Sequence, residues 1–348
     1  MTDSRADDTP LPPAYLEWCR RAVTAWAGVP VDITRVQPVP SRAARLVRLT
    51  GESHGRVRHF YLKMFTALDP SAFAAWCEAL ERIGRAFAGA EGLLAFDIVA
   101  YDAARHLILT AESEGRPIRR LQRRLPWSRD ARRASLDAWR GVGRWLDTLH
   151  WRTIPAVQSA DRAAALAGYV RERLRLWSTV DARHADLSRD AEHALGLLAG
   201  TLGDRPVTLT RCHGDISSGN VIIGRGVGLI DFDDSRTAMP GLDVSQVLLA
   251  LEQFCRLASL GPMPRFHARA VGAFLEGYGG REPEGPEFWL PHLRNLSVAV
   301  VTVGRRQDNP LLSRASSALH YRRLIEALRR AVRIVRDTGG WASYLPHN

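Results

Sequence analysis

Hydrophobic positions in this chain first follow a helical period and then the alternation of strands. Over residues 14 to 27, apolar side chains recur every three or four positions, at Leu16, Cys19, Val23 and Trp26, and a glycine follows. This spacing predicts an opening helix. Three segments rich in β-branched and aromatic residues come next: DITRVQPV, ARLVRLTG and RHFYLKMF. Because GESHGR between the last two is typical of a turn, we expect three consecutive antiparallel strands.

A second helix and two further strands complete the first part of the chain. Residues 71 to 88 have the period of a helix, and Asp69 or Ser71 could cap it. FDIVAYDA and HLILTAE are strand-like and are separated by a turn at residues 102 to 105. The pattern therefore predicts an α+β fold in which a five-stranded antiparallel sheet forms the small first lobe.

Composition changes at about residue 112, where SEGRP begins, and almost every segment from there to about residue 200 has a helical period. We therefore expect two lobes: a small N-terminal lobe with the leading helix and the sheet, residues 1–112, and a larger helical lobe, residues 113–348.

One polar interruption divides the helical part, VTLTRCHGDISSGNVIIGRGVGLIDF, residues 207 to 232. NVII and VGLIDF resemble paired strands, and the glycines at 224 and 226 supply a turn. Helices resume at LDVSQVLLALEQF. A polar loop on a small hairpin inside a helical lobe indicates a functional site.

Bulk composition is that of a soluble globular protein, with 46% hydrophobic and 24% charged residues. The four cysteines, Cys19, Cys77, Cys212 and Cys255, are far apart and lie in or beside apolar segments, which favours buried thiols in a reducing compartment. No segment has the hydrophobic core of a signal peptide or the length of a membrane span. We expect a cytoplasmic protein.

The net charge of +11 admits two interpretations. Arginines spread over solvated helix faces would explain it without a partner, and no nucleic-acid-binding motif accompanies the charge. The densest cluster, RPIRRLQRRLPWSRDARR from Arg116 to Arg133, could instead touch a membrane surface or an anionic polymer. An amphipathic helix with its connecting loop is the simpler interpretation.

Three residues of the polar interruption form a constellation with oxygen ligands. Asp215 and Asn220 bracket one tight loop, and Asp231 ends the strand that returns from the hairpin. Two carboxylates and an amide oxygen are ligands suited to Mg²⁺ held together with the phosphates of a nucleotide. A carboxylate facing a substrate hydroxyl could also accept its proton. The set predicts phosphoryl transfer.

The motif HGDISSGN, residues 213 to 220, followed by IDFDD, residues 230 to 234, resembles the aminoglycoside phosphotransferase and choline kinase family. WLDTLHWRTIP, residues 145 to 155, resembles the family's helix that ends in Leu-His. The resemblance spans about residues 30 to 255 in the order of its elements. It implies a bilobal, protein-kinase-like fold in which residues 1–112 bind the nucleotide and residues 113–348 carry the catalytic loop and the substrate site.

The resemblance also implies roles for individual residues. Asp215 would be the catalytic base or would orient the hydroxyl, Asn220 would bind Mg²⁺, and Asp231 would be the main Mg²⁺ ligand. His213 would brace the catalytic loop by hydrogen bonds. Asp243, in PGLDVS, would correspond to the aspartate that stiffens this loop.

Lys63 is the single lysine among 48 lysines and arginines, and it lies on the third predicted strand. There the family places a lysine that holds the α- and β-phosphates and pairs with a helix glutamate. Glu78 and Glu81 both lie on the expected helix, with Glu78 preferred. Adenine would lie against the backbone near residues 111 to 113, from Ala111 to Ser113.

Three positions depart from the protein-kinase pattern. The loop PVPSRAA between the first two strands lacks glycines, so Ser41 and nearby amides would cover the phosphates. Position 217 is serine where protein kinases have lysine. Asp233 replaces the glycine of the D-F-G triplet and could add a metal ligand.

Together these features predict an Mg²⁺-dependent kinase that transfers the γ-phosphate of ATP, or of GTP, to a hydroxyl of a small molecule. Aminoglycosides, sugars, amino alcohols and glycolipids are the acceptor classes considered, and the basic charge argues against polycationic drugs. The acceptor is expected near Glu252, Glu276 or Trp289. The alternative is a catalytically silent, kinase-like protein that binds a nucleotide or serves as a scaffold.

Overall fold

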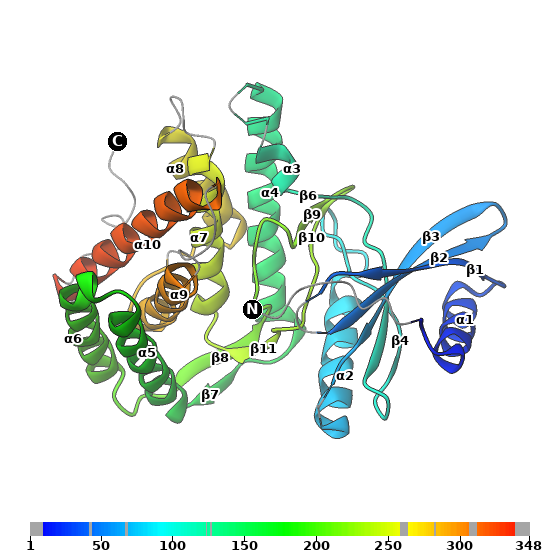
Figure 1. Ribbon diagram of the computed structural model, residues 1–348, viewed down its shortest axis with the longest axis horizontal. Helices are drawn as coiled ribbons and strands as arrows, with labels where there is room; N and C mark the ends of the chain where they lie inside the picture. The colour runs from blue at the N-terminus through cyan, green and yellow to red at the C-terminus, as the bar shows by residue number, and fades with distance from the viewer. Residues whose placement is uncertain are drawn as a thin grey trace. The chain divides into compact units, whose positions relative to one another are not determined.

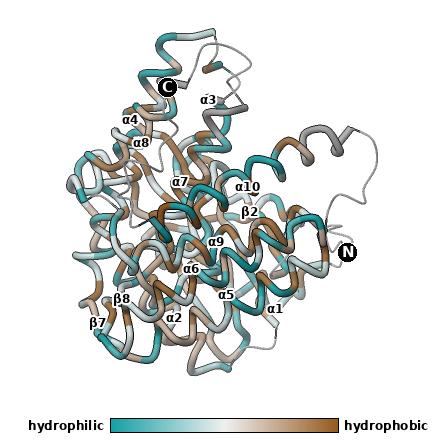
Figure 2. Tube along the Cα trace, turned by 90° about the vertical axis from the view of Figure 1, so that its left-hand side faces the viewer, coloured by the Kyte–Doolittle hydropathy of each residue, from teal (hydrophilic) through white to brown (hydrophobic). Residues whose placement is uncertain are grey.

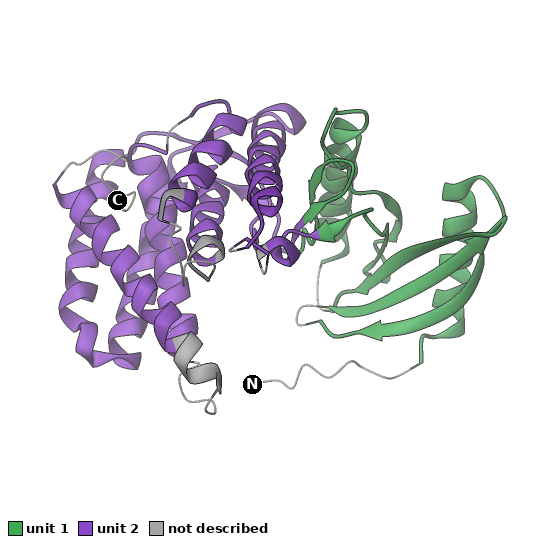
Figure 3. Ribbon diagram, turned by 90° about the horizontal axis from the view of Figure 1, so that it is seen from above, with its two compact units in different colours: residues 1–116, 222–233 green, residues 117–221, 234–348 purple. Residues whose placement is uncertain are grey.

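The computed structural model describes residues 10–41, 44–66, 69–122, 124–125, 127–257, 264–281, 283–305 and 312–337. Contacts divide the chain into two compact units (Figure 3). Unit 1 comprises Met1–Arg116 and Ile222–Asp233, and unit 2 comprises Pro117–Val221 and Asp234–Asn348.

This division differs from the single boundary expected after residue 112. It falls after Arg116, and it returns the hairpin residues 222–233 to unit 1. The backbone explains the return, because Leu94 N–H donates to Val227 O at 2.8 Å and Val227 N–H donates to Gly92 O at 3.0 Å. Hydrogen bonds between such distant segments leave no local pattern in a sequence.

Unit 1 contains the five-stranded antiparallel sheet that the sequence predicts, with strand order β1-β2-β3-β5-β4 (Figure 1). Its elements are α1 (Pro13–Ala27), β1 (Asp32–Val39), β2 (Arg45–Ser53), β3 (Arg56–Met64), α2 (Pro70–Phe87), β4 (Ile98–Asp102) and β5 (Leu107–Ala111). The observed bounds lie within two residues of the expected ones for each of these helices and strands.

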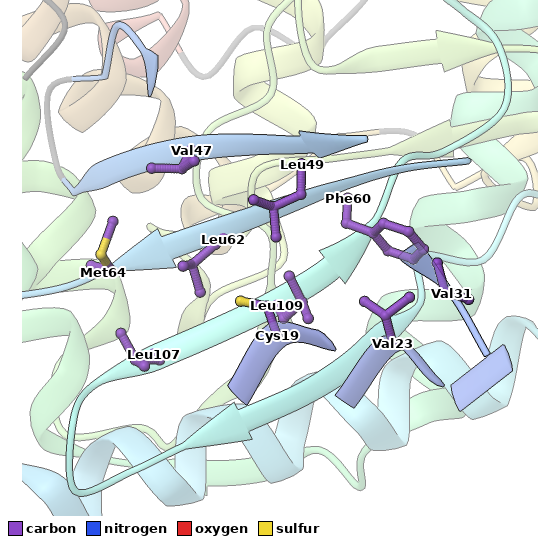
Figure 4. Close-up of a cluster of buried hydrophobic side chains, with 10 residues drawn as sticks. All are labelled: Cys19, Val23, Val31, Val47, Leu49, Phe60, Leu62, Met64, Leu107 and Leu109. Carbon is purple, nitrogen blue, oxygen red and sulfur yellow. The ribbon is translucent and has the colours of Figure 1, made fainter. Parts of the chain in front are cut away.

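Side chains of β3 alternate between the two faces of the sheet. Phe60 and Leu62 are buried in one cluster with Cys19 and Val23 of α1 (Figure 4). Lys63 follows Leu62 in the strand and therefore points to the opposite face. Helix α1 thus covers one face of the sheet and leaves the lysine on the other.

Helix α2 begins after a capping residue that accepts a hydrogen bond from a backbone N–H of the first turn. Asp69 is the cap, because Ala72 N–H donates to Asp69 Oδ1 at 2.9 Å. The helix contacts the sheet region through Phe73, whose ring lies 5.7 Å from that of Phe65 and 5.6 Å from that of His106. These contacts fix the helix that carries Glu78.

Unit 2 is mainly helical. Its helices are α3 (Arg119–Gln122), α4 (Arg129–Thr148), α5 (Asp161–Val180), α6 (Ala185–Leu202), α7 (Gly241–Leu257), α8 (Pro264–Gly277), α9 (Pro286–Gly304) and α10 (Leu312–Arg336), with a π-helical turn at Leu149–Thr153 and a 3₁₀ turn at Ala182–His184. Figure 2 shows hydrophobic and hydrophilic residues alternating along helices such as α5 and α6. This alternation is the amphipathic pattern that the sequence predicts.

The chain also forms two small sheets. One has the order β11-β8-β7 and comprises β7 (Val157–Ser159), β8 (Val207–Cys212) and β11 (Arg236–Ala238). The other has the order β10-β9-β6 and comprises β6 (Arg116–Pro117), β9 (Val221–Ile223) and β10 (Val227–Leu229). The hairpin of β9 and β10 was predicted, whereas β6, β7 and β11 were not, because two or three residues are too few to show a strand period.

Helices α4 and α8 approach closely at two glycines. A β-carbon at Gly143 would lie 2.2 Å from Phe274 O, and one at Gly277 would lie 2.0 Å from Arg140 O. No real side chain tolerates such distances. The two glycines therefore allow backbone-to-backbone packing of this helix pair.

Cys19, Cys77 and Cys212 are buried free thiols, as expected; the side chain of Cys255 lies outside the described residues. Burial raises the pKa of Cys19 to about 12. Within the described residues, no helix has the length and hydropathy needed to cross a membrane. Helix α3, Trp127 and the first turns of α4 form the described part of the basic cluster at Arg116 to Arg133, and the Trp127 side chain is 87% exposed.

Candidate active site

The loop of the HGD motif, residues 213–220, connects β8 to β9 and is braced by Asp243 of α7. The buried carboxylate of Asp243 accepts a hydrogen bond from His213 N–H at 2.6 Å and another from Gly214 N–H at 2.9 Å. His150 Nε2 lies 3.1 Å from Asp243 Oδ2, and its Nδ1 lies 2.7 Å from Tyr278 Oη. Asp243 therefore fixes the start of the loop, as the resemblance implied.

The electrostatics of Asp243 agree with this role. Burial would raise the pKa of Asp243, but the hydrogen bond and charge of His150 and the backbone N–H of Gly214 outweigh it and lower the pKa. The carboxylate is thus held ionised beneath the loop. His150 is a fully buried residue with both ring nitrogens in hydrogen bonds.

Gln246 is a second brace, which sequence reasoning missed. Its Oε1 accepts from Ile216 N–H at 2.9 Å, and its Nε2 donates to Gly214 O at 2.6 Å. Gln246 lies three residues after Asp243, so both side chains leave α7 on the same face. The spacing D-x-x-Q at the start of the helix was the available signal.

Gly214 satisfies a backbone requirement of the loop. Its φ of +87° lies in the left-handed region, and a β-carbon there would be 2.2 Å from Asp234 O. Only glycine fits this contact. The loop is therefore packed directly against the segment that leads into β11.

Asp215 is exposed next to these fixed groups, and Asn220 orients it. Asn220 Nδ2 donates to Asp215 Oδ2 at 3.1 Å and to Asp215 O at 3.0 Å. Asp215 N–H donates to His213 Nδ1 at 3.3 Å, and the His213 side chain is fully buried. The loop thus presents a carboxylate to solvent in a fixed orientation, while His213 stabilises the loop from inside.

Lys63 of unit 1 lies between two carboxylates from the hairpin end. Its Nζ donates to Asp231 Oδ1 at 2.5 Å and to Asp233 Oδ1 at 2.6 Å. The Lys63 side chain is 16% exposed, that of Asp233 is 18% exposed and that of Asp231 is 44% exposed. Asp233 is consequently the more deeply buried of the two partners.

These charges shift the pKa values of the group. Burial lowers the pKa of Lys63, but the carboxylates of Asp233 and Asp231 outweigh that effect and raise it. Burial and the neighbouring charge of Asp231 raise the pKa of Asp233, although Lys63 opposes them. Two carboxylates this close would gain from a further cation.

The expected pairing of Lys63 with Glu78 is wrong for this structure. Glu78 is exposed on α2, and within the described part of the chain neither Glu78 nor Glu81 forms an ion pair with Lys63. Asp233 takes that position because the hairpin carries it to the lysine-bearing face. Helical phase alone could not have shown this.

Asp231 was expected to end the returning strand. In the structure β10 ends at Leu229, and Asp231 lies two residues beyond it. Its φ of +71° is in the left-handed region, which aspartate tolerates better than most residues. This conformation separates Asp231 from the ladder and lets its side chain reach Lys63. Such backbone outliers are frequent at functional sites.

The positions expected to contact adenine lie at the end of β5. Ala111 N–H already donates to Asp97 O at 2.9 Å, and Glu112 N–H donates to His59 O at 2.8 Å. Among the described residues, Ser113 makes no hydrogen bond, so its backbone is the candidate left for a nucleotide. Ser41 is half-buried, and the next two residues lie outside the described residues, so its role stays a prediction.

Metal ligation suits the residues that the sequence suggested. Asp231, Asp233 and Asn220 offer hard oxygen atoms, and the paired acids of unit 1 concentrate negative charge. Within the described residues, the group of histidine, cysteine and acidic side chains with the spacing of metal ligands is His150, Cys212 and Asp243. That group is buried, and Asp243 already accepts three hydrogen bonds, so we assign it a structural role.

The profile of the phosphotransferase enzyme family (APH) matches residues 35–292. The chain belongs to this family. It is therefore a phosphotransferase. No curated protein sequence matches the chain.

Solved structures similar to this phosphotransferase share its kinase-like fold. Amicoumacin kinase hAmiN, solved with AMP-PNP, Ca²⁺ and Ami, is 13% identical, with 96% of this chain and 97% of that chain covered and a TM-score of 0.52. A glucosamine kinase is 14% identical, with 92% and 82% covered and a TM-score of 0.53. The streptomycin–ATP complex of APH(2'')-IIa is 14% identical, with 89% and 96% covered and a TM-score of 0.50.

Proposed function

We propose that this phosphotransferase transfers the γ-phosphate of ATP to a hydroxyl of a small molecule in an Mg²⁺-dependent reaction, with GTP as the alternative donor. The observation that carries the proposal is the exposed carboxylate of Asp215, oriented by Asn220 on a loop that Asp243 braces. A fixed acceptor of protons beside a solvent-accessible space is what alcohol phosphorylation requires.

In this reaction Asp215 aligns the attacking hydroxyl and accepts its proton as the new oxygen–phosphorus bond forms, while the bond from the γ-phosphorus to the β–γ bridging oxygen breaks and ADP leaves. The alignment contributes a large part of the rate enhancement. Because the reactants are already oriented when bound, they lose less entropy on reaching the transition state. Asn220 and His213 keep the carboxylate in place from the two ends of the loop.

Lys63 supplies positive charge for the phosphates of the nucleotide. Its ammonium is held by Asp231 and Asp233 on the face of the sheet opposite α1. Ser113 offers backbone groups to the base, and Ser41 lies on the loop expected to cover the phosphates.

Asp231, Asp233 and Asn220 would hold the metal. Mg²⁺, when bound, neutralises charge on the phosphate oxygens. The nucleotide and the divalent ion named with amicoumacin kinase hAmiN, AMP-PNP and Ca²⁺, support the same requirements here. Three buried free thiols support our proposal that the enzyme works in the reducing cytoplasm.

The test is transfer of ³²P from γ-labelled ATP to a panel of hydroxyl acceptors, with and without Mg²⁺. We expect Asp215→Asn to lower kcat by about 10²- to 10⁴-fold while nucleotide affinity changes little. Asp204→Asn, at an exposed aspartate between α6 and β8, is the matched control and should leave kcat unchanged.

The alternative of a silent scaffold predicts a different result. Nucleotide binding by the wild type, with no labelled product from any acceptor, would favour the scaffold. Equal kcat for Asp215→Asn and wild type would remove Asp215 from the mechanism.

A further inference from the structure

Two guanidinium groups in unit 2 gather around one aromatic ring. The Tyr169 ring of α5 lies 4.9 Å from the guanidinium carbon of Arg173 and 5.7 Å from that of Arg294 on α9. Helices α5 and α9 pack against each other (Figure 1). The ring therefore holds cations from both helices at one place.

Arg236 of β11 adds a third positive charge to this group. Its charge, together with burial, lowers the pKa of Arg294, whereas Tyr169 and Asp234 act in the opposite direction. We define the basic site as Tyr169, Arg173, Arg236 and Arg294.

Within the described residues, none of these three arginines forms an ion pair with a carboxylate. Arg294 donates to the neutral amide oxygen of Asn295 at 2.8 Å. Arg173 Nε is buried without a hydrogen-bond partner. The nearby Asp234 is exposed and forms no ion pair in the same set of residues.

Elsewhere in unit 2 the acids expected to bind an acceptor are already neutralised. Glu252 pairs with Arg330 at 2.9 Å, and Glu276 pairs with Arg140 at 3.0 Å. Trp289 is buried and only 5% exposed. The expected placement of the acceptor at these residues is therefore not supported, because neither glutamate is free for an ammonium group.

The basic site is close to the catalytic loop along the backbone. Arg236 is paired with Cys212 across the β8–β11 ladder, three residues before Asp215. Asp234, two residues before Arg236, lies against Gly214, where an added β-carbon would be 3.2 Å from its Cβ. An acceptor that places its hydroxyl at Asp215 could thus reach these arginines with another group.

We propose that Arg236 and Arg294, with Arg173 and Tyr169 beside them, bind an anionic group of the acceptor, a carboxylate or a phosphate ester. This inference rests on the proposed function and narrows its substrate class. Guanidinium groups bind both kinds of anion through paired N–H donors. An anion would also relieve the repulsion between the two arginines, neither of which forms an ion pair within the described residues.

Binding is tested first, without turnover. Glucuronate and inorganic phosphate serve as anionic probes and glucose as the neutral probe, titrated calorimetrically into the full-length enzyme. We expect the anionic probes to bind and the dissociation constant to rise at least 10-fold in Arg294→Gln and in Arg236→Gln. Arg175→Gln, at an exposed arginine of the same helix α5, is the matched control and should bind as the wild type does.

Phosphoryl transfer is tested with acceptor pairs that differ by one charge, glucose with glucuronate and glycerol with glycerate. We expect higher kcat/KM for the anionic member of at least one pair. Arg294→Gln should lower it at least 10-fold through KM and should leave the neutral member unaffected. The two anionic probes distinguish the two kinds of anion when each is added as an inhibitor of phosphoryl transfer. Inhibition by inorganic phosphate alone favours a phosphate ester, and inhibition by glucuronate favours a carboxylate.

Absence of anion binding by the wild type, or an equal loss for neutral and anionic acceptors in Arg294→Gln, would overturn the proposal. So would a preference for a cationic acceptor such as streptomycin. Failure of the proposed function has a separate signature, since Asp215→Asn would then not change turnover while anion binding could still be lost in Arg294→Gln.

Discussion

Lys63 lies where the resemblance places a phosphate-binding lysine, but its partners in the structure differ from the glutamate that was expected. The chain uses arginine for every other permanent cation, and a compact ammonium fits between two carboxylates better than a planar guanidinium does. Asp233 is 2.6 Å from Lys63 Nζ and is the more buried partner. We infer that Asp233, rather than Glu78, positions the lysine.

The single lysine allows a direct test of this positioning, because selective ¹⁵N-lysine labelling gives one side-chain signal. We expect Asp233→Asn to shift this signal in metal-free enzyme and to lower kcat/KM for the nucleotide about 10- to 100-fold, since one charged hydrogen bond to Lys63 is lost.

Glu78→Gln, at an exposed residue of α2, is the matched control and should leave both the signal and the kinetics unchanged. A shifted signal in Glu78→Gln with an unshifted one in Asp233→Asn would restore the pairing expected from the sequence.

At the scale of elements, the α4–α8 pair depends on the absence of two side chains. Gly277→Ala should lower the free energy of unfolding by about 2–4 kcal/mol, because the new methyl would overlap Arg140 O, which lies 2.0 Å from its position. Backbone atoms cannot rotate away as a side chain can, so the helices must separate. Urea unfolding followed by circular dichroism measures the change.

Gly272 provides the control for this prediction on the same helix α8. A β-carbon there would meet no atom within 4 Å, so Gly272→Ala should be neutral or stabilise the helix by up to about 1 kcal/mol. Equal losses for both variants would mean that helix propensity, and not the contact with α4, governs the position.

Local periodicity was enough to predict the main elements. The strands β1 to β5, the helix α2 with its cap at Asp69, and the hairpin of β9 and β10 follow from alternation, apolar spacing and turn residues. What the pattern did not contain was pairing over long distances. The strands β7 and β11, three residues each, exist because β8 lies between them, and no three-residue stretch has a readable period.

The residues of the candidate site are likewise of two kinds: those that a local motif identifies and those that depend on contacts between distant segments. The motif identified Asp215, Asn220 and Asp231, since their spacing is local, and the resemblance led to Asp243. Gln246 and the Lys63–Asp233 contact depend on which segments meet in three dimensions. A sequence gives the identity of such residues but not their partners.

At the scale of the whole molecule, net charge was a poor guide to the acceptor until the ion pairs were known. The arginines of unit 2 differ in their surroundings, because Arg140 and Arg330 neutralise glutamates whereas Arg236 and Arg294 have no carboxylate partner in the described chain. Part of the excess positive charge therefore lies at the basic site.

Global stability should fall in acid because of His292, a fully buried residue of α9 whose Nδ1 lies 2.8 Å from Ser245 Oγ. Burial lowers the pKa of His292 from 6.5 to about 3. The unfolded chain therefore binds a proton below about pH 6.5 that the folded chain does not bind, and stability decreases as the pH falls through this range. Between pH 7.5 and pH 5 we expect this residue to lower the free energy of unfolding by about 2 kcal/mol, from 1.36 kcal/mol per pKa unit.

The variant His292→Asn tests this contribution in urea unfolding at the two pH values. It should remove that part of the pH dependence, whatever its effect at pH 7.5. His193→Gln, at an exposed histidine of α6, is the control and should retain the pH dependence. An unchanged pH dependence in His292→Asn would show that other groups cause the acid sensitivity.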